Sequence, residues 1–180
     1  MKTKFIAIIA ILAAAVSGCK NEKSVDALDV VKPEVVDNTF KVTIRAVLKK
    51  DDDVALFYNE DGSSDFKTEP MWQNIKGDGT EQQVTYTLPE GVFPAQFRID
   101  LGLKKDQEDI VLRGITLEYK GKKREIAGGE LGVYFRPDET KCSFDAASGV
   151  IKAVVTNGQR QIPSLYPQDP LKAEIEKLAQ

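Results

Sequence analysis

The residues of this 180-residue chain whose types could do chemistry are its one tryptophan, an arginine–aspartate pair and a tyrosine. The flat indole of Trp72 can stack on the apolar face of a sugar ring. Arg98 and Asp100 are two residues apart in an alternating segment. This spacing places both on one strand face, about 7 Å apart, where they can bind sugar hydroxyl groups. Together with Tyr134, they form a candidate ligand-binding set.

These side chains also have structural interpretations, which are the commoner ones for such residue types. Trp72 suits the core or the edge of a sheet. Arg98 and Asp100 can form an ion pair on a solvated strand face. The same two interpretations apply to Arg136 and Asp138, which lie at the end of another expected strand.

Acidic and amide oxygens gather in two loops near the start of the expected domain. Asp51, Asp53, Asn59 and Asp61, with Asp52 beside them, offer the oxygen ligands that calcium prefers. They form a candidate structural calcium site, and no other cofactor is expected. The alternative is that they are solvated acids of ordinary turns.

The chain contains no histidine, which excludes Ser-His-Asp and Cys-His nucleophiles, His-ligated zinc and His acid–base catalysis within it. Hydrolysis of a glycan by a carboxylate pair needs a defined separation of the two groups, which sequence does not supply. We therefore expect a protein that is not an enzyme. Cys142, within Lys-Cys-Ser-Phe-Asp, is expected to be a small buried side chain of a strand, with a reactive thiol as the alternative.

The first 19 residues follow a pattern of their own. Lys2 and Lys4 precede an apolar run over residues 5–15, and Val16-Ser17-Gly18 leads to Cys19. The run of about 11 residues fits a secretory signal and is shorter than the ~20 residues that a spanning helix needs. The Val-Ser-Gly-Cys motif resembles the lipobox of bacterial lipoproteins. An ordinary signal peptide or a short membrane helix is the alternative.

The lipoprotein resemblance implies that residues 1–18 are a cleaved signal peptide and that Cys19 carries a diacylglycerol and an acylated amine. Several acyl chains hold a protein on a membrane far more firmly than one. Lipoproteins of the inner membrane often carry Asp after the cysteine, so Lys20 implies the outer membrane, at its periplasmic face or at the cell surface. Residues 19–38, polar and containing Pro33, are expected to form the lipidated cysteine and a flexible tether.

Charge limits the classes of partner. The net charge of the chain is −3, and removal of Lys2 and Lys4 with the signal peptide lowers it by two to −5. No long basic stripe remains, so nucleic acid is not expected as a partner. The expected partners are a membrane, through the N-terminal lipid, and a polysaccharide or an envelope protein.

Hydrophobic alternation predicts the architecture of residues 39–180. Apolar residues recur at every second position over residues 40–48, 83–88 and 97–101, which is typical of half-buried strands. A change of parity at Gly114, within residues 110–119, indicates a bulge. Further strands are expected in residues 54–58, 66–75, 131–136, 142–144 and 150–155, and a helix in residues 171–178. This pattern predicts an all-β fold, a jelly-roll-like antiparallel β-sandwich with one short C-terminal helix.

Four segments within residues 52–119 carry a second resemblance. They read Val-Ala-Leu-Phe-Tyr, Tyr-Thr-Leu-Pro-Glu-Gly, Gln-Phe-Arg-Ile-Asp-Leu-Gly and Ile-Val-Leu-Arg-Gly-Ile-Thr-Leu-Glu-Tyr. They are similar to carbohydrate-binding-like β-sandwich modules of bacterial envelope proteins. The resemblance covers under half of the chain after Cys19 and implies a glycan ligand, although a fold does not by itself determine a function.

These observations favour a lipid-anchored cell-envelope protein whose β-sandwich binds a glycan or an envelope partner. The alternative is a structural or assembly subunit of an outer-membrane protein complex, which would dock through a sheet edge or its C-terminal helix. A small carboxylate-based glycan hydrolase is the third hypothesis.

Overall fold

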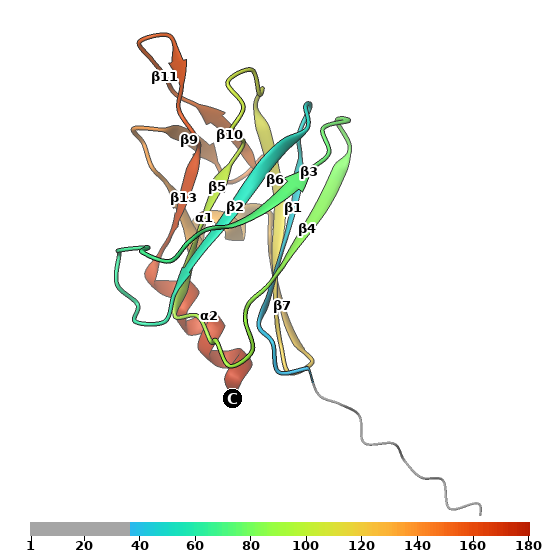
Figure 1. Ribbon diagram of the computed structural model, residues 1–180, viewed down its shortest axis with the longest axis vertical. Helices are drawn as coiled ribbons and strands as arrows, with labels where there is room; N and C mark the ends of the chain where they lie inside the picture. Colours follow the sequence, from blue (N-terminus) through green and yellow to red (C-terminus); the bar gives the residue numbers. More distant parts are fainter. Residues whose placement is uncertain (1–36) are drawn as a thin grey trace, which may run out of the picture. The chain divides into compact units, whose positions relative to one another are not determined.

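Two antiparallel sheets face each other in the computed structural model, which describes residues 37–180 (Figure 1). Sheet A consists, in spatial order, of β4 (Glu81–Thr87), β1 (Lys41–Val47), β6 (Ile110–Tyr119), β10 (Val150–Ala153) and β9 (Cys142–Asp145), with β7 (Lys122–Ala127) paired to β6. Sheet B consists of β3 (Met71–Ile75), β2 (Asp52–Asn59), β5 (Gln96–Leu101), β13 (Ser164–Pro167) and β8 (Phe135–Pro137). The prediction of an antiparallel β-sandwich is confirmed. The expected signal peptide, Cys19 and nearly all of the expected tether lie outside the described residues.

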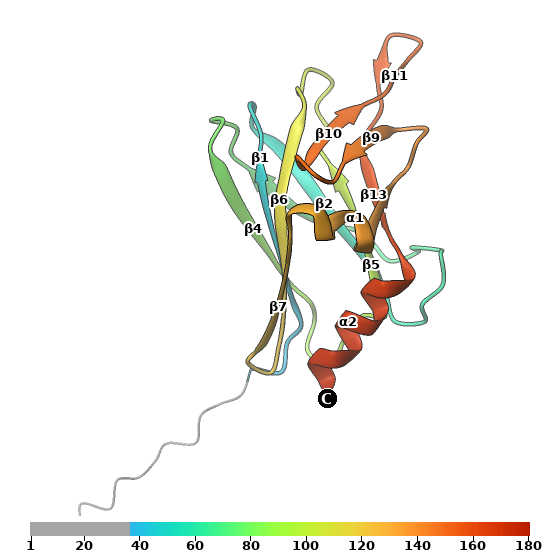
Figure 2. The same ribbon diagram turned by 180° about the vertical axis from the view of Figure 1, so that it is seen from behind.

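A small hairpin and three helical segments complete the described part of the chain. The hairpin pairs β11 (Val155–Thr156) with β12 (Gln159–Arg160) and extends past the end of the two sheets (Figure 1). The helical segments are η1 (Gly128–Glu130), α1 (Leu131–Tyr134) and α2 (Asp169–Ala179), and the two α-helices are seen from behind in Figure 2. None of the helices in residues 37–180 is both long enough and apolar enough to cross a membrane.

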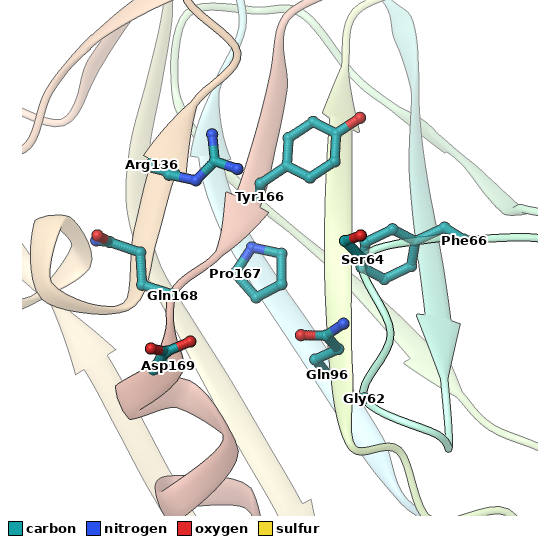
Figure 3. A pocket seen from close by; sticks show the side chains of 9 residues that line it. All are labelled: Gly62, Ser64, Phe66, Gln96, Arg136, Tyr166, Pro167, Gln168 and Asp169. Carbon is teal, nitrogen blue, oxygen red and sulfur yellow. The ribbon is translucent and has the colours of Figure 1, made fainter.

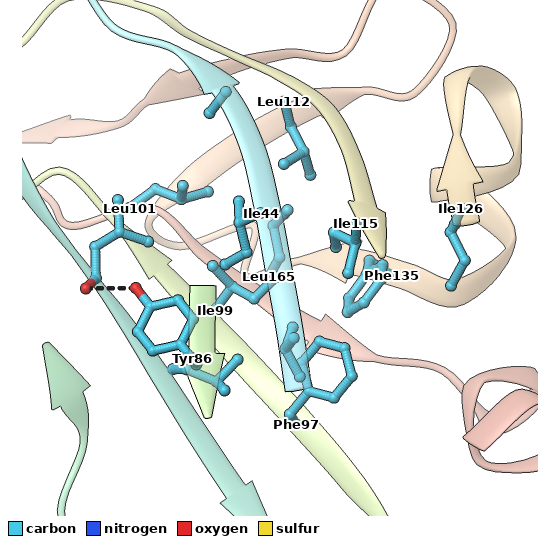
Figure 4. Close-up of a cluster of buried hydrophobic side chains, with 14 of the residues drawn as sticks. Ile44, Tyr86, Phe97, Ile99, Leu101, Leu112, Ile115, Ile126, Phe135 and Leu165 are labelled. Atoms are coloured by element: carbon cyan, nitrogen blue, oxygen red, sulfur yellow. Dashed lines mark hydrogen bonds between the residues drawn. The ribbon is translucent and has the colours of Figure 1, made fainter. Parts of the chain in front are cut away.

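The inward-facing residues of the two sheets form one hydrophobic core (Figure 4). Along β1, Val42, Ile44 and Ala46 are completely buried, and the residues between them are only partly covered. β5 shows the same alternation, as the sequence predicts. Helix α2 adds Leu171, Ile175 and Leu178, which are spaced to lie on one helix face and are all buried. The amphipathic C-terminal helix therefore packs on its own domain.

A hydrogen bond joins the two sheets inside this core. Tyr86 on β4 of sheet A is fully buried, and its hydroxyl group donates to the backbone oxygen of Val54 on β2 of sheet B at 2.8 Å (Figure 4). Burial raises the pKa of this phenol well above its usual value. A buried phenol hydroxyl group needs a hydrogen-bond acceptor, and the backbone oxygen of Val54 supplies one.

The predicted bulge lies where Gly114 interrupts the alternation of β6. Arg45 on β1 pairs with Gly114, whereas the next residue, Ala46, pairs with Leu112, so Arg113 is the extra residue. A Cβ atom at position 114 would lie 2.6 Å from the Arg45 side chain and 3.1 Å from the Ile126 backbone oxygen. A side chain here would displace the end of Arg45 and press on the Ile126 carbonyl group, so this crowded position favours glycine.

Several segments differ from the sequence prediction. The strand expected over residues 66–75 begins only at Met71, and strands β12 and β13 were not expected. Residues 131–136 were expected to form a strand, but Leu131 and Tyr134 are buried three positions apart while Val133 is 53% exposed. This spacing fits one helical turn, α1, and the strand begins only at Phe135. Strand β7 was missed because its first four residues are charged. The turn before it, Lys120-Gly121, has positive φ at both positions, which is the signature of a tight hairpin.

We expect Tyr86→Phe to lower the free energy of unfolding by about 1–3 kcal/mol, because the buried hydrogen bond between the two sheets would be lost. Tyr119→Phe is the matched control, since Tyr119 lies at the margin of the same core with its hydroxyl making no hydrogen bond within residues 37–180. Urea denaturation of both variants measures the difference. Equal stability of the two would show that the inter-sheet hydrogen bond contributes nothing.

Candidate ligand-binding face

The outer face of sheet B carries a row of aromatic and charged side chains. Because alternate residues of a strand face opposite ways, the residues between the buried ones on β2, β5 and β13 point outward. Phe57 lies opposite Arg98 across the β2–β5 pair, and Arg136 lies opposite Tyr166 across the β8–β13 pair. A hydrogen bond of 3.4 Å from Arg98 Nη1 to the Tyr166 hydroxyl joins the two halves. The row therefore crosses four strands.

Trp72 lies on the same face, on the edge strand β3. It pairs with Ala55, which in turn pairs with Asp100 on the other side, so Trp72 and Asp100 flank Ala55. The indole is 45% exposed, which excludes the core and agrees with the edge position. Three of the four predicted ligand-binding residues, Trp72, Arg98 and Asp100, thus share one sheet face.

Arg98 and Asp100 form a largely covered ion pair. The Arg98 Nε and Nη2 atoms each donate to the Asp100 carboxylate at 3.0 Å, and the two side chains are only 16% and 12% exposed. The guanidinium carbon lies 3.8 Å from the centroid of the Phe57 ring and 5.6 Å from that of Phe66. The structure therefore shows the ion pair between Arg98 and Asp100 that the sequence offered as the structural interpretation, but on a face that is mostly covered and not solvated. Through its contacts with the two rings, the Arg98 guanidinium group holds the aromatic row in place.

A cavity of about 400 Å³ opens beside this row, between β8, β13 and the loop of residues 60–70 (Figure 3). Phe66 and Tyr166, whose ring centroids are 6.2 Å apart, form its apolar side. Its polar lining includes Arg136, Gln96 and Asp169. A volume of this size is within the range of small-ligand sites.

Tyr134 belongs to a different cluster. It is 8% exposed in α1, and its hydroxyl group accepts a hydrogen bond of 3.2 Å from Arg124 Nη2 on β7. Arg124 also forms ion pairs with Glu130 and with Glu174 of α2. The side chain that the sequence offered as a ligand contact thus helps to join α1 and α2 to sheet A.

The four candidate calcium ligands lie at opposite ends of one strand. Asp51 and Asp53 are at the start of β2, and Asn59 and Asp61 are at its end. The six residue steps from Asp53 to Asn59, at ~3.3 Å each, separate the two pairs by about 20 Å, so they do not share one ion. Among residues 37–180, no three acidic or sulfur side chains are grouped as a metal site would need.

The individual hydrogen bonds show what these oxygens do instead. The backbone N–H of Gly77 and then the Lys76 side chain lower the pKa of the Asp51 carboxyl group. The Asn59 amide donates to Ser63 O at 2.6 Å and accepts from the Gly62 N–H at 3.2 Å. Both residues therefore organise turns.

Asp52 has a role that the run of three aspartates does not reveal. It is fully buried, and its carboxylate accepts hydrogen bonds from the backbone N–H groups of Asp53 and Leu103 at 2.8 Å and of Lys104 at 3.1 Å. The Gln107 side chain donates to it at 3.0 Å. Asp52 therefore holds the loop between β5 and β6, the connection from sheet B to sheet A.

Cys142 is buried in β9, as expected for a small core side chain. Burial raises the pKa of its thiol. Two aromatic residues of the face were missed by sequence reasoning. Tyr166 sits between prolines, and only the alternation beside Leu165 could have indicated a strand there. Phe66 was expected to begin a strand over residues 66–75, but it lies in the loop before β3.

Searches against protein-family models, curated proteins and solved structures find no match to this chain. The chemistry of the sheet B face is therefore the basis for a functional proposal.

We expect Asp100→Asn to lower the free energy of unfolding by about 1–3 kcal/mol, because it leaves the Arg98 charge largely covered and without a carboxylate. Asp65→Asn is the control, since Asp65 and Lys67 form an exposed ion pair whose loss should cost less than about 0.5 kcal/mol. Chemical denaturation compares the two. An Asp100→Asn variant as stable as the control would contradict a structural role for the pair.

Proposed function

We propose that this protein is a lipid-anchored envelope protein, not an enzyme, that binds a glycan on the outer face of sheet B. The observation that carries the proposal is an exposed tryptophan on the same sheet face as an aromatic–arginine row with a cavity beside it. Exposed aromatic rings held on a rigid sheet are suited to stacking on sugar rings.

The rigidity of the face supports binding with little loss of entropy. Phe57 and Tyr166 are fixed by the Arg98 guanidinium between them, which lies 3.8 and 5.3 Å from the two ring centroids. Side chains that are ordered before a ligand arrives need not be ordered by it. The face is thus organised in advance of binding.

The small number of carboxylates at the cavity favours ligand binding over hydrolysis as its function. Asp169 is the one carboxylate among its described lining residues. Asp100, the acid of the adjacent row, is engaged by Arg98. Hydrolysis by the usual carboxylate mechanism uses two acids, one of them free to carry a proton.

The proposed anchor is the lipid on Cys19, in the outer membrane. Its support is the Val-Ser-Gly-Cys motif after a short apolar run, together with Lys20. A tether of about 18 residues would let the domain reach a ligand clear of the lipid headgroups. Neither Cys19 nor Lys20 is among the described residues.

The assembly-subunit alternative retains one supporting observation. The apolar face of α2 is buried in its own domain, so this helix offers no apolar face to a partner. Strand β3, however, is one of the two outermost strands of sheet B in the described part of the chain, and an edge of this kind can accept a partner strand.

The glycan proposal predicts that a panel of polysaccharides contains at least one ligand that changes the fluorescence of Trp72, the one tryptophan of the chain. Trp72→Ala should weaken binding of that ligand by about tenfold, measured by calorimetry, because one stacking contact is lost. It should change stability by less than about 1 kcal/mol, because the indole is largely exposed.

Val155→Ala is the control for this experiment. Val155 is 63% exposed on the β11–β12 hairpin, away from sheet B, and its loss should leave binding unchanged. If no polysaccharide binds while an envelope protein is crosslinked through β3, the assembly alternative replaces the glycan proposal.

The anchor proposal predicts that Cys19→Ala abolishes labelling by an alkyne analogue of palmitate and releases the protein from the membrane fraction. The matched control is Cys142→Ala, which removes the other of the two cysteines and should leave labelling intact. Persistent labelling of the Cys19→Ala variant would disprove lipidation at this residue.

A further inference from the structure

Two arginines contact the Tyr166 ring, but only one of them has its charge neutralised. The guanidinium carbons of Arg98 and Arg136 lie 5.3 and 5.5 Å from the Tyr166 ring centroid. Arg98 forms two hydrogen bonds with Asp100. Arg136 is exposed, and its guanidinium group has neither a hydrogen bond nor an ion pair with any residue in the described range 37–180.

The position of Arg136 makes it part of the cavity. It comes from β8, and in Figure 3 its guanidinium group turns toward the Tyr166 ring at the wall of the cavity. Contact with the ring restricts the side chain, while its five N–H donors remain available. A planar fork of this kind is matched to a carboxylate or another oxyanion, which it can bind with two parallel hydrogen bonds.

The remaining polar groups of the cavity differ in chemistry from Arg136. Among the described lining residues, Arg136 is the one cation, and Asp169 is the one anion. Gln96 and Ser64 add neutral groups, with the Gln96 amide nitrogen already donating to the Ser63 backbone oxygen. A hydroxyl group can donate to the Asp169 carboxylate, whereas a second anion would be repelled there.

Phe66 and Tyr166 supply apolar surface to the same cavity. A ligand that uses the whole cavity therefore carries an oxyanion for Arg136, hydroxyl groups for the other polar groups and an apolar face for the two rings. A sugar acid has these three features on one ring. A neutral sugar would leave the Arg136 charge unused, and a free inorganic anion would leave the hydroxyl-binding and apolar parts unused.

We infer that the cavity binds an acidic sugar unit of a polysaccharide, with its carboxylate or sulfate group paired to Arg136. The inference rests on the proposed function and specifies its class of ligand. Carboxylate and sulfate share the chemistry that the guanidinium recognises, and the choice of polymers in the test separates them.

The test uses the full-length protein in detergent, calorimetry at 150 mM salt and two matched pairs of polymers. Polygalacturonate is compared with its methyl-esterified form, and dextran sulfate is compared with dextran. At this ionic strength the Debye length is ~8 Å, which suppresses long-range attraction of polyelectrolytes. At least one acidic polymer should bind about tenfold or more tightly than its neutral counterpart. The acidic polymer that does so identifies the group as carboxylate or sulfate.

Two arginine variants locate the interaction. Arg136→Gln should weaken binding of that acidic polymer by about 10- to 100-fold, the loss typical of hydrogen bonds to a charged group, and leave binding of neutral polymers unchanged. Arg113→Gln is the matched control, because Arg113 is an exposed arginine on β6 of sheet A. It should bind like the unmodified protein. Thermal unfolding confirms that both variants are folded.

The results distinguish binding of an acidic sugar from binding of glycans in general. Equal binding of acidic and neutral polymers, or equal effects of the Arg136 and Arg113 substitutions, would overturn the acidic-sugar inference and leave glycan binding in place. Failure of all four polymers to bind, with binding of some other neutral glycan, would also overturn only the inference. Failure of every glycan would overturn both.

Discussion

The alternation of side chains along the strands of sheet B is the constraint on which its outer face depends. Burial of Ile99 and Leu165 in the core sends Arg98 and Tyr166 to the opposite side of the sheet. The pairing of β5 with β13 then brings these two outward residues next to each other. A slip of one residue would bury Arg98 and expose Ile99. The same register therefore stabilises the core and assembles the face.

The buried Asp52 carboxylate secures this arrangement where the chain passes between the sheets. It collects the N–H groups of Leu103 and Lys104, which begin the connection from β5 to β6. Gly102, just before them, has a φ of +72°, and an added Cβ atom would lie 3.2 Å from the Asp52 carboxylate. A carboxylate that accepts several backbone donors can remain buried, because those donors replace its hydration. The end of β5 is thus tied to the start of β2, the strand with which it forms the centre of the face.

Arg98 and Arg136 show how surroundings decide the role of a side chain. Both contact Tyr166, and both were proposed from the sequence with a binding interpretation and a structural one. The covered Asp100 carboxylate gives Arg98 a structural role. Arg136, on the last strand of sheet B, has no such neighbour in the described chain and lines a cavity with Asp169 at another part of its wall. In the site that we propose, binding and support are therefore divided between two residues of the same type.

Local patterns in the sequence were enough to determine the strands that alternate clearly, the bulge at Gly114 and the outward position of Arg98 and Asp100, because alternation depends only on neighbouring residues. They were not enough to place Tyr134, whose alternating neighbours form one helical turn instead of a strand. Only the tertiary structure decided that Tyr166 lies beside Arg98, 68 positions earlier in the chain, and that Asp52 is buried among backbone donors. The physical reason is that these contacts depend on which strands become neighbours. Which strands become neighbours depends on how the whole core is buried, and the sequence of a single segment does not contain that information.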